Sequence, residues 1–113
     1  MLDFEQSALP VEPAFLVTIV SETILKESLL MLLTKLNVKS YTVSEVQGAG
    51  RYMRRSADPA MSTSDNQMIE ANLEIKAIVS EELSNVILYA LKEQQREFAI
   101  FVYRQQVESL IEE

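Results

Sequence analysis

The sequence contains no cysteine and no histidine. Without cysteine the chain has no disulfide, no thiolate nucleophile and no zinc site of the cysteine type, which fits a cytoplasmic location. Without histidine a Ser-His-Asp triad is excluded and a transition-metal site is disfavoured. Covalent and acid–base catalysis thereby lose their commonest groups, so the composition favours a protein that is not an enzyme, with no catalytic residues and no metal ligands.

Positive charge is also scarce, with 10 Lys and Arg against 17 Asp and Glu and a formal net charge of −7. This balance argues against nucleic-acid binding, which needs a broad positive face. No apolar run reaches the roughly 18 residues of a membrane span, so direct membrane insertion is not expected. The length of 113 residues predicts one domain, residues 1–113, in which Met1–Pro13 is an N-terminal tail rather than a signal peptide.

Only two glycines occur, Gly48 and Gly50, and both lie in the stretch Gln47–Arg55. The same stretch holds three arginines: Arg51, Arg54 and Arg55. Glycine lets backbone amides approach a ligand closely, and the planar guanidinium fork matches phosphate oxygens. The stretch therefore suggests a phosphate site, with a flexible loop of solvated charges as the alternative.

The hydrophobic pattern predicts four strands and two helices. The strands are Ala14–Val20, Ser40–Val46, Ile69–Val79 and Phe98–Tyr103, from their β-branched and aromatic content or their alternation. Apolar residues at helical spacing predict one helix over Thr23–Leu36 and a second one after Ser80. Ser21 and Ser80 are the expected N-caps, and Asn37 is the expected end of the first helix.

The remaining segments connect these elements. Gly48–Gln67 has no apolar period and is predicted to be a long polar loop, and Val107–Leu110 a short helical turn. The order strand, helix, strand, strand, helix, strand gives two βαβ units. Ile19–Glu22 recurs as Ile78–Glu81 (Ile-Val-Ser-Glu) at the two strand-to-helix junctions, which supports a repeat. We therefore predict an α+β, ferredoxin-like βαββαβ sandwich.

In such a fold the helices cover only one face of the sheet. The first and last predicted strands are apolar on both sides, and in the last one Phe101 and Tyr103 would lie on the face opposite to Phe98, Ile100 and Val102. Exposed apolar patches of this kind usually mark an interface. We therefore expect a homo-oligomer that packs these open faces together.

The chain resembles the PII-like signalling proteins, and more closely their SbtB branch, the carbon-sensing PII-like proteins of cyanobacteria. The resemblance lies in the order and spacing of short matches: Ile19–Glu22, Tyr41–Val43, Gly48–Gly50, Glu70–Asn72, and Phe98-Ala99 followed by Val102-Tyr103. It implies a homotrimer with adenine nucleotides (cAMP, AMP, ADP or ATP) in clefts between subunits. It also implies a nucleotide-dependent T-loop at residues 48–67.

The same resemblance implies a partner and a location. SbtB-type proteins are associated with the membrane bicarbonate transporter SbtA. By that likeness the chain would be a cytoplasmic regulator of inorganic-carbon uptake, recruited to the membrane peripherally through its partner.

The nucleotide-binding residues that the resemblance and the loop implicate are Thr42, Gln47, Gly48, Gly50, Arg51, Arg54, Arg55, Asn72, Phe98, Ala99 and Ile100. The related pattern at the loop base is Gly-Lys-Gly-Ser-Arg. Here Ala49 replaces the lysine, which weakens the expectation of tight triphosphate binding more than that of monophosphate binding. The sequence leaves open whether a divalent cation binds together with ATP. Glu22 has two interpretations, a ribose contact or a dipole partner in the first helical turn.

Two other functions remain in view. Gln47–Gly50 is similar to the phosphate cradle of acylphosphatases, but that cradle lies between the first strand and the first helix, whereas this one follows the second strand. A carboxysome-associated PII-like sensor of ADP or AMP together with bicarbonate is closer, and the loop residues do not separate it from SbtB. An RNA-recognition domain is set aside because the basic surface is missing.

Overall fold

The computed structural model describes residues 9–48 and 70–112. Its elements are β1 (Val11–Glu22), a 3₁₀ turn η1 (Thr23–Leu25), α1 (Lys26–Lys35), β2 (Thr42–Gly48), β3 (Glu70–Val79), α2 (Glu81–Gln94) and β4 (Ile100–Leu110). This order confirms the predicted βαββαβ arrangement. The predicted loop beyond Gly48 and most of the predicted N-terminal tail lie outside the described residues.

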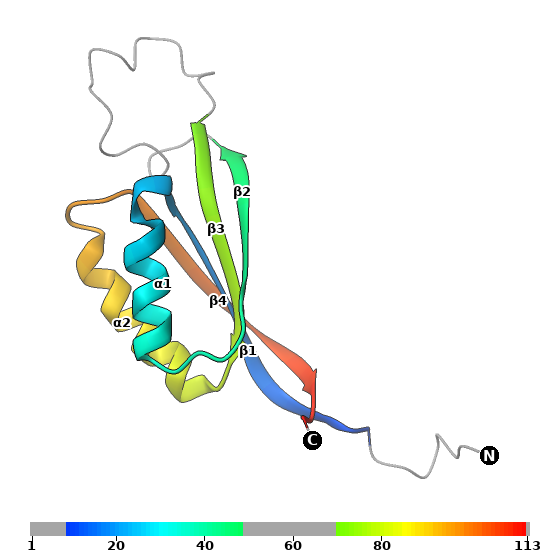
Figure 1. Cartoon of the computed structure of the whole chain (residues 1–113). Helices are drawn as coiled ribbons and strands as arrows, with labels where there is room; N and C mark the ends of the chain where they lie inside the picture. Colours follow the sequence, from blue (N-terminus) through cyan, green and yellow to red (C-terminus); the bar gives the residue numbers. More distant parts are fainter. Residues whose placement is uncertain (1–8, 49–69, 113) are drawn as a thin grey trace, which may run out of the picture.

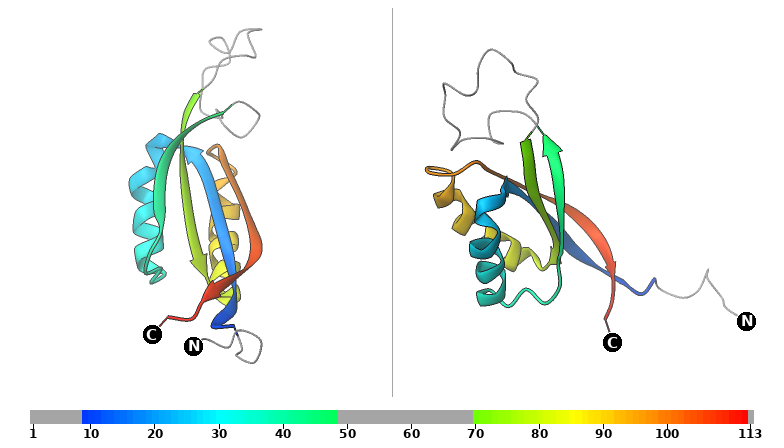
Figure 2. Two further views of the ribbon diagram at one scale, coloured as in Figure 1. Left: turned by 90° about the vertical axis from the view of Figure 1, so that its right-hand side faces the viewer. Right: turned by 45° about the horizontal axis from the view of Figure 1, so that its top comes forward.

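The four strands form one antiparallel sheet in the order β2-β3-β1-β4. Both helices cover the same face of this sheet, as Figure 1 shows and the turned views of Figure 2 confirm. This is the predicted ferredoxin-like α+β fold. Within residues 9–48 and 70–112, the other face carries no helix.

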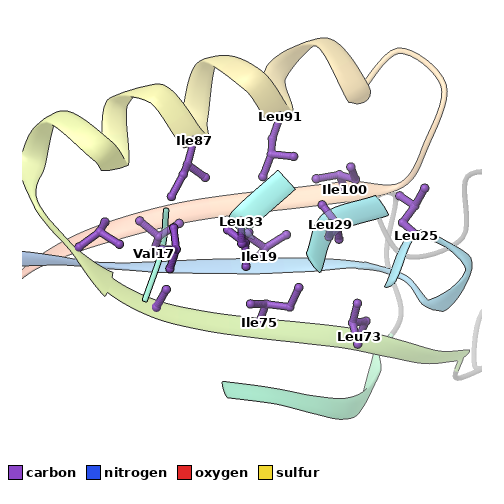
Figure 3. Close-up of a cluster of buried hydrophobic side chains, with 13 residues drawn as sticks. Val17, Ile19, Leu25, Leu29, Leu33, Leu73, Ile75, Ile87, Leu91 and Ile100 are labelled. Atoms are coloured by element: carbon purple, nitrogen blue, oxygen red, sulfur yellow. The ribbon is translucent and has the colours of Figure 1, made fainter. Parts of the chain in front are cut away.

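The hydrophobic core lies between the helices and the sheet (Figure 3). Ile87 and Leu91 of α2 point toward the sheet, and each is at most 1% exposed. The sheet side is built from alternate residues of the strands, because successive side chains of a strand point to opposite faces. Its buried members in the two central strands are Val17, Ile19, Leu73, Ile75, Ala77 and Val79.

The β1–β4 pair extends beyond the rest of the sheet, from Val11 opposite Leu110 to Ser21 opposite Ile100. β1 therefore begins three residues before the predicted Ala14. Pro13 fits this strand because β3 ends at Val79, opposite Phe15, so β1 has only one neighbour at Pro13. The predicted helical turn at residues 107–110 is wrong. The polar residues there alternate along a strand that pairs with β1.

Ser21 is not the N-cap of the first helix. It is fully buried within β1, and its hydroxyl donates to the Glu22 carbonyl oxygen at 3.1 Å. The chain instead enters α1 through the 3₁₀ turn, with no side-chain cap at Glu22 or Leu25. Glu22 is thus the last residue of a strand, and its interpretation as a dipole partner in a first helical turn is wrong.

The other two helix signals are confirmed. The Ser80 hydroxyl accepts a hydrogen bond from the Leu83 amide at 3.2 Å, which caps α2. Asn37 follows α1 with φ of 64°, the left-handed conformation that asparagine tolerates better than most residues. The cap at Ser80 and the left-handed conformation at Asn37 both depend on residues close in sequence, so the sequence alone can predict them.

Replacement of Ser80 by alanine is expected to lower the free energy of unfolding by about 1 kcal/mol, because the first turn of α2 loses its capping acceptor. Urea denaturation followed by circular dichroism measures the change. Ser28→Ala is the control, since Ser28 is exposed within α1, and it should change stability by less than about 0.5 kcal/mol. Equal losses in the two variants would contradict a capping role for Ser80.

Among the described residues, the helix-free face of the sheet carries the exposed apolar side chains of Ile78, Phe101 and Tyr103. The register places Phe101 opposite Val20 and Tyr103 opposite Thr18. The rings of Phe101 and Tyr103 meet edge to face, with centroids 5.5 Å apart. Phe101 and Tyr103 thus lie on the face opposite to the buried Ile100, as predicted, and the structure shows that this is the open face.

Candidate functional site

Four strand ends meet at one end of the sheet: the last residues of β1 and β2, Glu22 and Gly48, and the first residues of β3 and β4, Glu70 and Ile100. We call this the loop-side end, because β2 ends and β3 begins there (Figure 1). Antiparallel pairing of β1 with β3, of β3 with β2 and of β1 with β4 brings these ends together. Residues from four distant parts of the sequence thus share one edge.

A link between Glu22 and Ala99 holds the loop-side end. The Ala99 amide donates to Glu22 Oε2 at 2.8 Å, and the Glu22 amide donates to the Ala99 carbonyl oxygen at 3.3 Å. Glu22 is 9% exposed and Ala99 is 1% exposed. A hydrogen bond from an amide to a buried carboxylate is charge-assisted and is stronger than one between neutral groups. The end of β1 and the approach to β4 are therefore joined across 77 positions of the sequence.

The segment before β4 is also hydrogen-bonded within the chain. The Phe98 amide donates to the Gln94 carbonyl oxygen at 3.0 Å, and Gln95 Nε2 donates to the Ile100 carbonyl oxygen at 3.1 Å. The fold therefore uses the amides of both Phe98 and Ala99. The carbonyl oxygens of Ala99 and Ile100 are also engaged, by the Glu22 amide and by the Gln95 side chain.

Asn72 lies in the middle of this arrangement. It pairs with Glu22 on one side and with Val46 on the other, so the three residues form a row on the helix-free face. Directly opposed residues of antiparallel strands have Cβ atoms about 5 Å apart. Asn72 is 1% exposed, although the alternation of β3 placed it on the polar side of the strand. A buried amide beside a buried carboxylate is a specific polar arrangement and not ordinary surface polarity.

The structure brings together several of the predicted contact residues. Gly48 ends β2, and Gln47 precedes it as an exposed residue opposite Ala71. Asn72, Ala99 and Ile100 are buried at the same end, and Phe98 is partly buried against the core. Gly50, Arg51, Arg54 and Arg55 lie outside the described residues and remain predictions.

Thr42 is the exception. It begins β2, opposite Lys76, whereas Gly48 ends the same strand. Six residues of strand separate the two by about 20 Å. Thr42 therefore does not lie near the loop of its own subunit, and that expectation is wrong. Thr42 instead lines a shallow hollow of about 250 Å³ with Tyr41, Lys76 and Ile78.

Sequence reasoning weighed Glu22 but did not place it in the site. One signal was present. Glu22 ends an apolar, β-branched run, and a carboxylate that is buried with such a run needs a hydrogen-bonding partner. Its interpretation as a helical residue concealed that signal. Only the pairing of β1 with β4 shows that the carboxylate reaches the Ala99 amide.

A second hollow, of about 410 Å³, lies between the two helices. Its lining is mostly apolar and includes Leu25, Met31, Leu32, Ala90 and Ile100. Apart from Ile100 it contains none of the predicted contact residues. Among residues 9–48 and 70–112, no group of three acidic, cysteine or histidine side chains is arranged to hold a metal ion. Within the same residues, neither helix is long and apolar enough to cross a membrane.

Comparison with known proteins identifies the family. The family model for the nitrogen regulatory protein P-II matches residues 14–111. The chain belongs to the P-II family. Proteins of this family are signalling regulators and not enzymes, and the PII-like proteins among them are homotrimers. The acylphosphatase-like alternative is therefore wrong.

Solved structures of PII-like proteins resemble the chain along most of its length. A PII-like signalling protein from Thermus thermophilus is 28% identical, with a TM-score of 0.67 over 90% of this chain and 94% of that one. CPII from Thiomonas intermedia, bound to ADP and bicarbonate, is 23% identical, with a TM-score of 0.71 over 92% and 95%. GlnK from B. subtilis in complex with ATP is 23% identical, with a TM-score of 0.52 over 82% and 83%. A comparison with curated proteins gave no match.

Proposed function

We propose that this P-II family protein is a regulator that binds an adenine nucleotide at the loop-side end, in a cleft completed by a neighbouring subunit of a homotrimer. One observation carries the proposal. Gly48, which opens the arginine-rich stretch, ends β2 at the same edge as the buried link between Glu22 and Ala99 and the buried Asn72. Glycine at that position lets a phosphate approach the backbone, and the arginines that follow it in sequence supply charge.

We assign one group of residues to the phosphates of the nucleotide and another group to its nucleoside. Gln47, Gly48, Gly50 and the three arginines would meet the phosphates. Asn72 and the segment from Phe98 to Ile100 would meet the nucleoside, the segment through packing, because the amides of Phe98 and Ala99 and the carbonyl oxygens of Ala99 and Ile100 are already engaged. Thr42 would take part only if the neighbouring subunit brings it to the cleft. The replacement of the family lysine by Ala49 favours AMP or cyclic AMP over ATP.

Calorimetric titration tests this function. We expect wild-type protein to bind at least one of cyclic AMP, AMP, ADP and ATP, with ATP measured both with and without Mg²⁺ or Ca²⁺. Arg55→Ala should weaken binding of the preferred nucleotide by at least about tenfold, because a charge-assisted phosphate contact is lost. Lys39→Ala removes the same charge from an exposed position before β2, at the end of that strand away from Gly48, and should leave the affinity unchanged. No binding of any of the four at millimolar concentration would refute the function.

More specifically, we propose that the protein has the function of the SbtB branch of PII-like proteins. The nucleotide would control the T-loop at residues 48–67, and the loop would regulate the bicarbonate transporter SbtA from the cytoplasmic side, with the protein recruited to the membrane through that partner. A ligand shifts such a loop only by its differential affinity for the two loop states. Co-purification with detergent-solubilised SbtA should therefore change between AMP-, cyclic AMP- and ATP-loaded protein. No co-purification in any ligand state would remove the transporter from the proposal.

A second candidate is a sensor that binds bicarbonate together with ADP or AMP, the ligands named for CPII structures. The same titration distinguishes the two candidates. If bicarbonate raises the affinity for ADP or AMP severalfold while chloride at equal ionic strength does not, the bicarbonate sensor is favoured. If bicarbonate does not change the affinity for ADP or AMP, the bicarbonate sensor is excluded and the SbtB-type function is retained.

A further inference from the structure

The start of β1 and the end of β4 form a two-stranded arm that extends beyond the rest of the sheet (Figure 1). We define the arm as residues 11–14 paired with residues 107–110. β3 ends at Val79, opposite Phe15, so among the described residues no strand lies on the other side of β1 within the arm. The arm therefore has a free edge along β1.

Two hydrogen bonds show which backbone groups of β1 face β4. The Glu22 amide donates to the Ala99 carbonyl oxygen, and the Ile111 amide donates to the Pro10 carbonyl oxygen at 2.9 Å. The pairing of β1 with β4 between these two points is consecutive. Backbone groups of successive strand residues point to opposite sides, so the even-numbered residues of β1 face β4 and the odd-numbered residues face away from it.

The free edge of the arm lacks available hydrogen-bond donors. The odd-numbered residues of β1 within the arm are Val11 and Pro13. The Val11 amide already donates to the Leu9 carbonyl oxygen at 2.8 Å, and proline has no amide hydrogen. A strand added at this edge would find carbonyl oxygens but no amide, and would lose every hydrogen bond that needs a donor from the arm.

From this arrangement we infer that the free edge of β1 is closed to strands of other chains, and that this closure prevents open-ended association of the protein. The arm is otherwise suited to such association. Leu110 and Ile111 at its end are 70% and 52% exposed, and an extended edge with apolar side chains is a template for strand pairing. The inference does not depend on the nucleotide site.

One closed edge is sufficient to stop growth. The outer edge of β4 has no comparable block, since residues 102–110 contain no proline. A head-to-tail polymer of arms would pair the β4 edge of one copy with the β1 edge of the next, and such a contact continues without limit unless it closes into a ring. Without donors on the β1 edge, this repeating contact does not form.

Restoring an amide at position 13 tests the inference on the full chain. Pro13→Val gives the free edge a donor and a side chain that favours strands, and Pro13→Ala gives it the donor with a small side chain. We expect the weight-average mass of both variants to rise above that of wild type as concentration increases. Each restored hydrogen bond should strengthen a strand contact about fivefold. Light scattering and sedimentation velocity measure the mass.

Glu12→Ala is the matched control, because Glu12 is the exposed neighbour of Pro13 and its amide faces β4. This variant should keep the wild-type mass, although it removes a charge. Wild-type mass in both Pro13 variants would overturn the inference. Association of Pro13→Val alone would assign the effect to the side chain and would also overturn it, as would growth of the wild-type protein beyond a fixed mass. Circular dichroism and reversal on dilution separate strand pairing from aggregation of unfolded chains.

Discussion

Replacement of Ile87 by alanine is expected to lower the free energy of unfolding by about 3 kcal/mol. Ile87 is 0% exposed and points from α2 into the core against the sheet (Figure 3). Truncation removes buried methyl and methylene groups and leaves a cavity that the surrounding side chains fill only in part. Urea denaturation monitored by circular dichroism, with equal slopes for variant and wild type, measures the loss.

The adjacent residue supplies the control for this experiment. Val86 is 45% exposed on the same helix, so Val86→Ala should cost less than about 1 kcal/mol. The two residues are neighbours in sequence, yet only Ile87 is buried. Similar losses for the two variants would mean that α2 is rotated about its axis relative to the orientation described above.

Replacement of Tyr103 by aspartate is expected to dissociate the proposed homotrimer into single 12.8 kDa subunits. Tyr103 lies on the helix-free face beside Phe101, where the open faces of three subunits would pack together. A carboxylate placed there would lose its hydration on assembly without gaining a partner, which opposes association by several kcal/mol. Gel filtration with light scattering reports the mass in solution.

Tyr89→Asp makes the same substitution on the opposite side of the molecule. Tyr89 is 79% exposed on α2, away from the open face, so this variant should keep the mass of the wild type. A wild-type protein that elutes at the mass of one subunit would contradict the trimer proposal. A trimer that survives Tyr103→Asp would move the subunit interface away from this part of β4.

Local signals predicted the fold well. Alternation in β3, the helical stripe with Ser80 at its start, and Asn37 at the end of α1 were all interpreted correctly, because each depends on residues close in sequence. The incorrect predictions concern residues whose conformation depends on contacts with residues far away in the sequence. Ser21 resembles an N-cap as closely as Ser80 does, yet pairing with β4 keeps it in a strand.

The candidate site was predicted less completely. Gly48 and the arginines attracted attention through their residue types, and Asn72 and the segment from Phe98 to Ile100 through resemblance. The expectation that Thr42 lies near the loop was wrong, because a short motif does not show at which end of a strand a residue lies. The link between Glu22 and Ala99 was missed, because the two residues lie 77 positions apart and Ala99 contributes only its backbone.

By itself, then, the sequence determined the ferredoxin-like order of elements, the open apolar face and the glycine–arginine stretch. These follow from periodicity, composition and local backbone preference, all of which act over a few residues. Only the tertiary structure decided that the Ala99 amide is taken by a buried carboxylate and that Asn72 lies beside it. Hydrogen bonds across a sheet depend on strand register, and register is set by the packing of the whole core against α1 and α2.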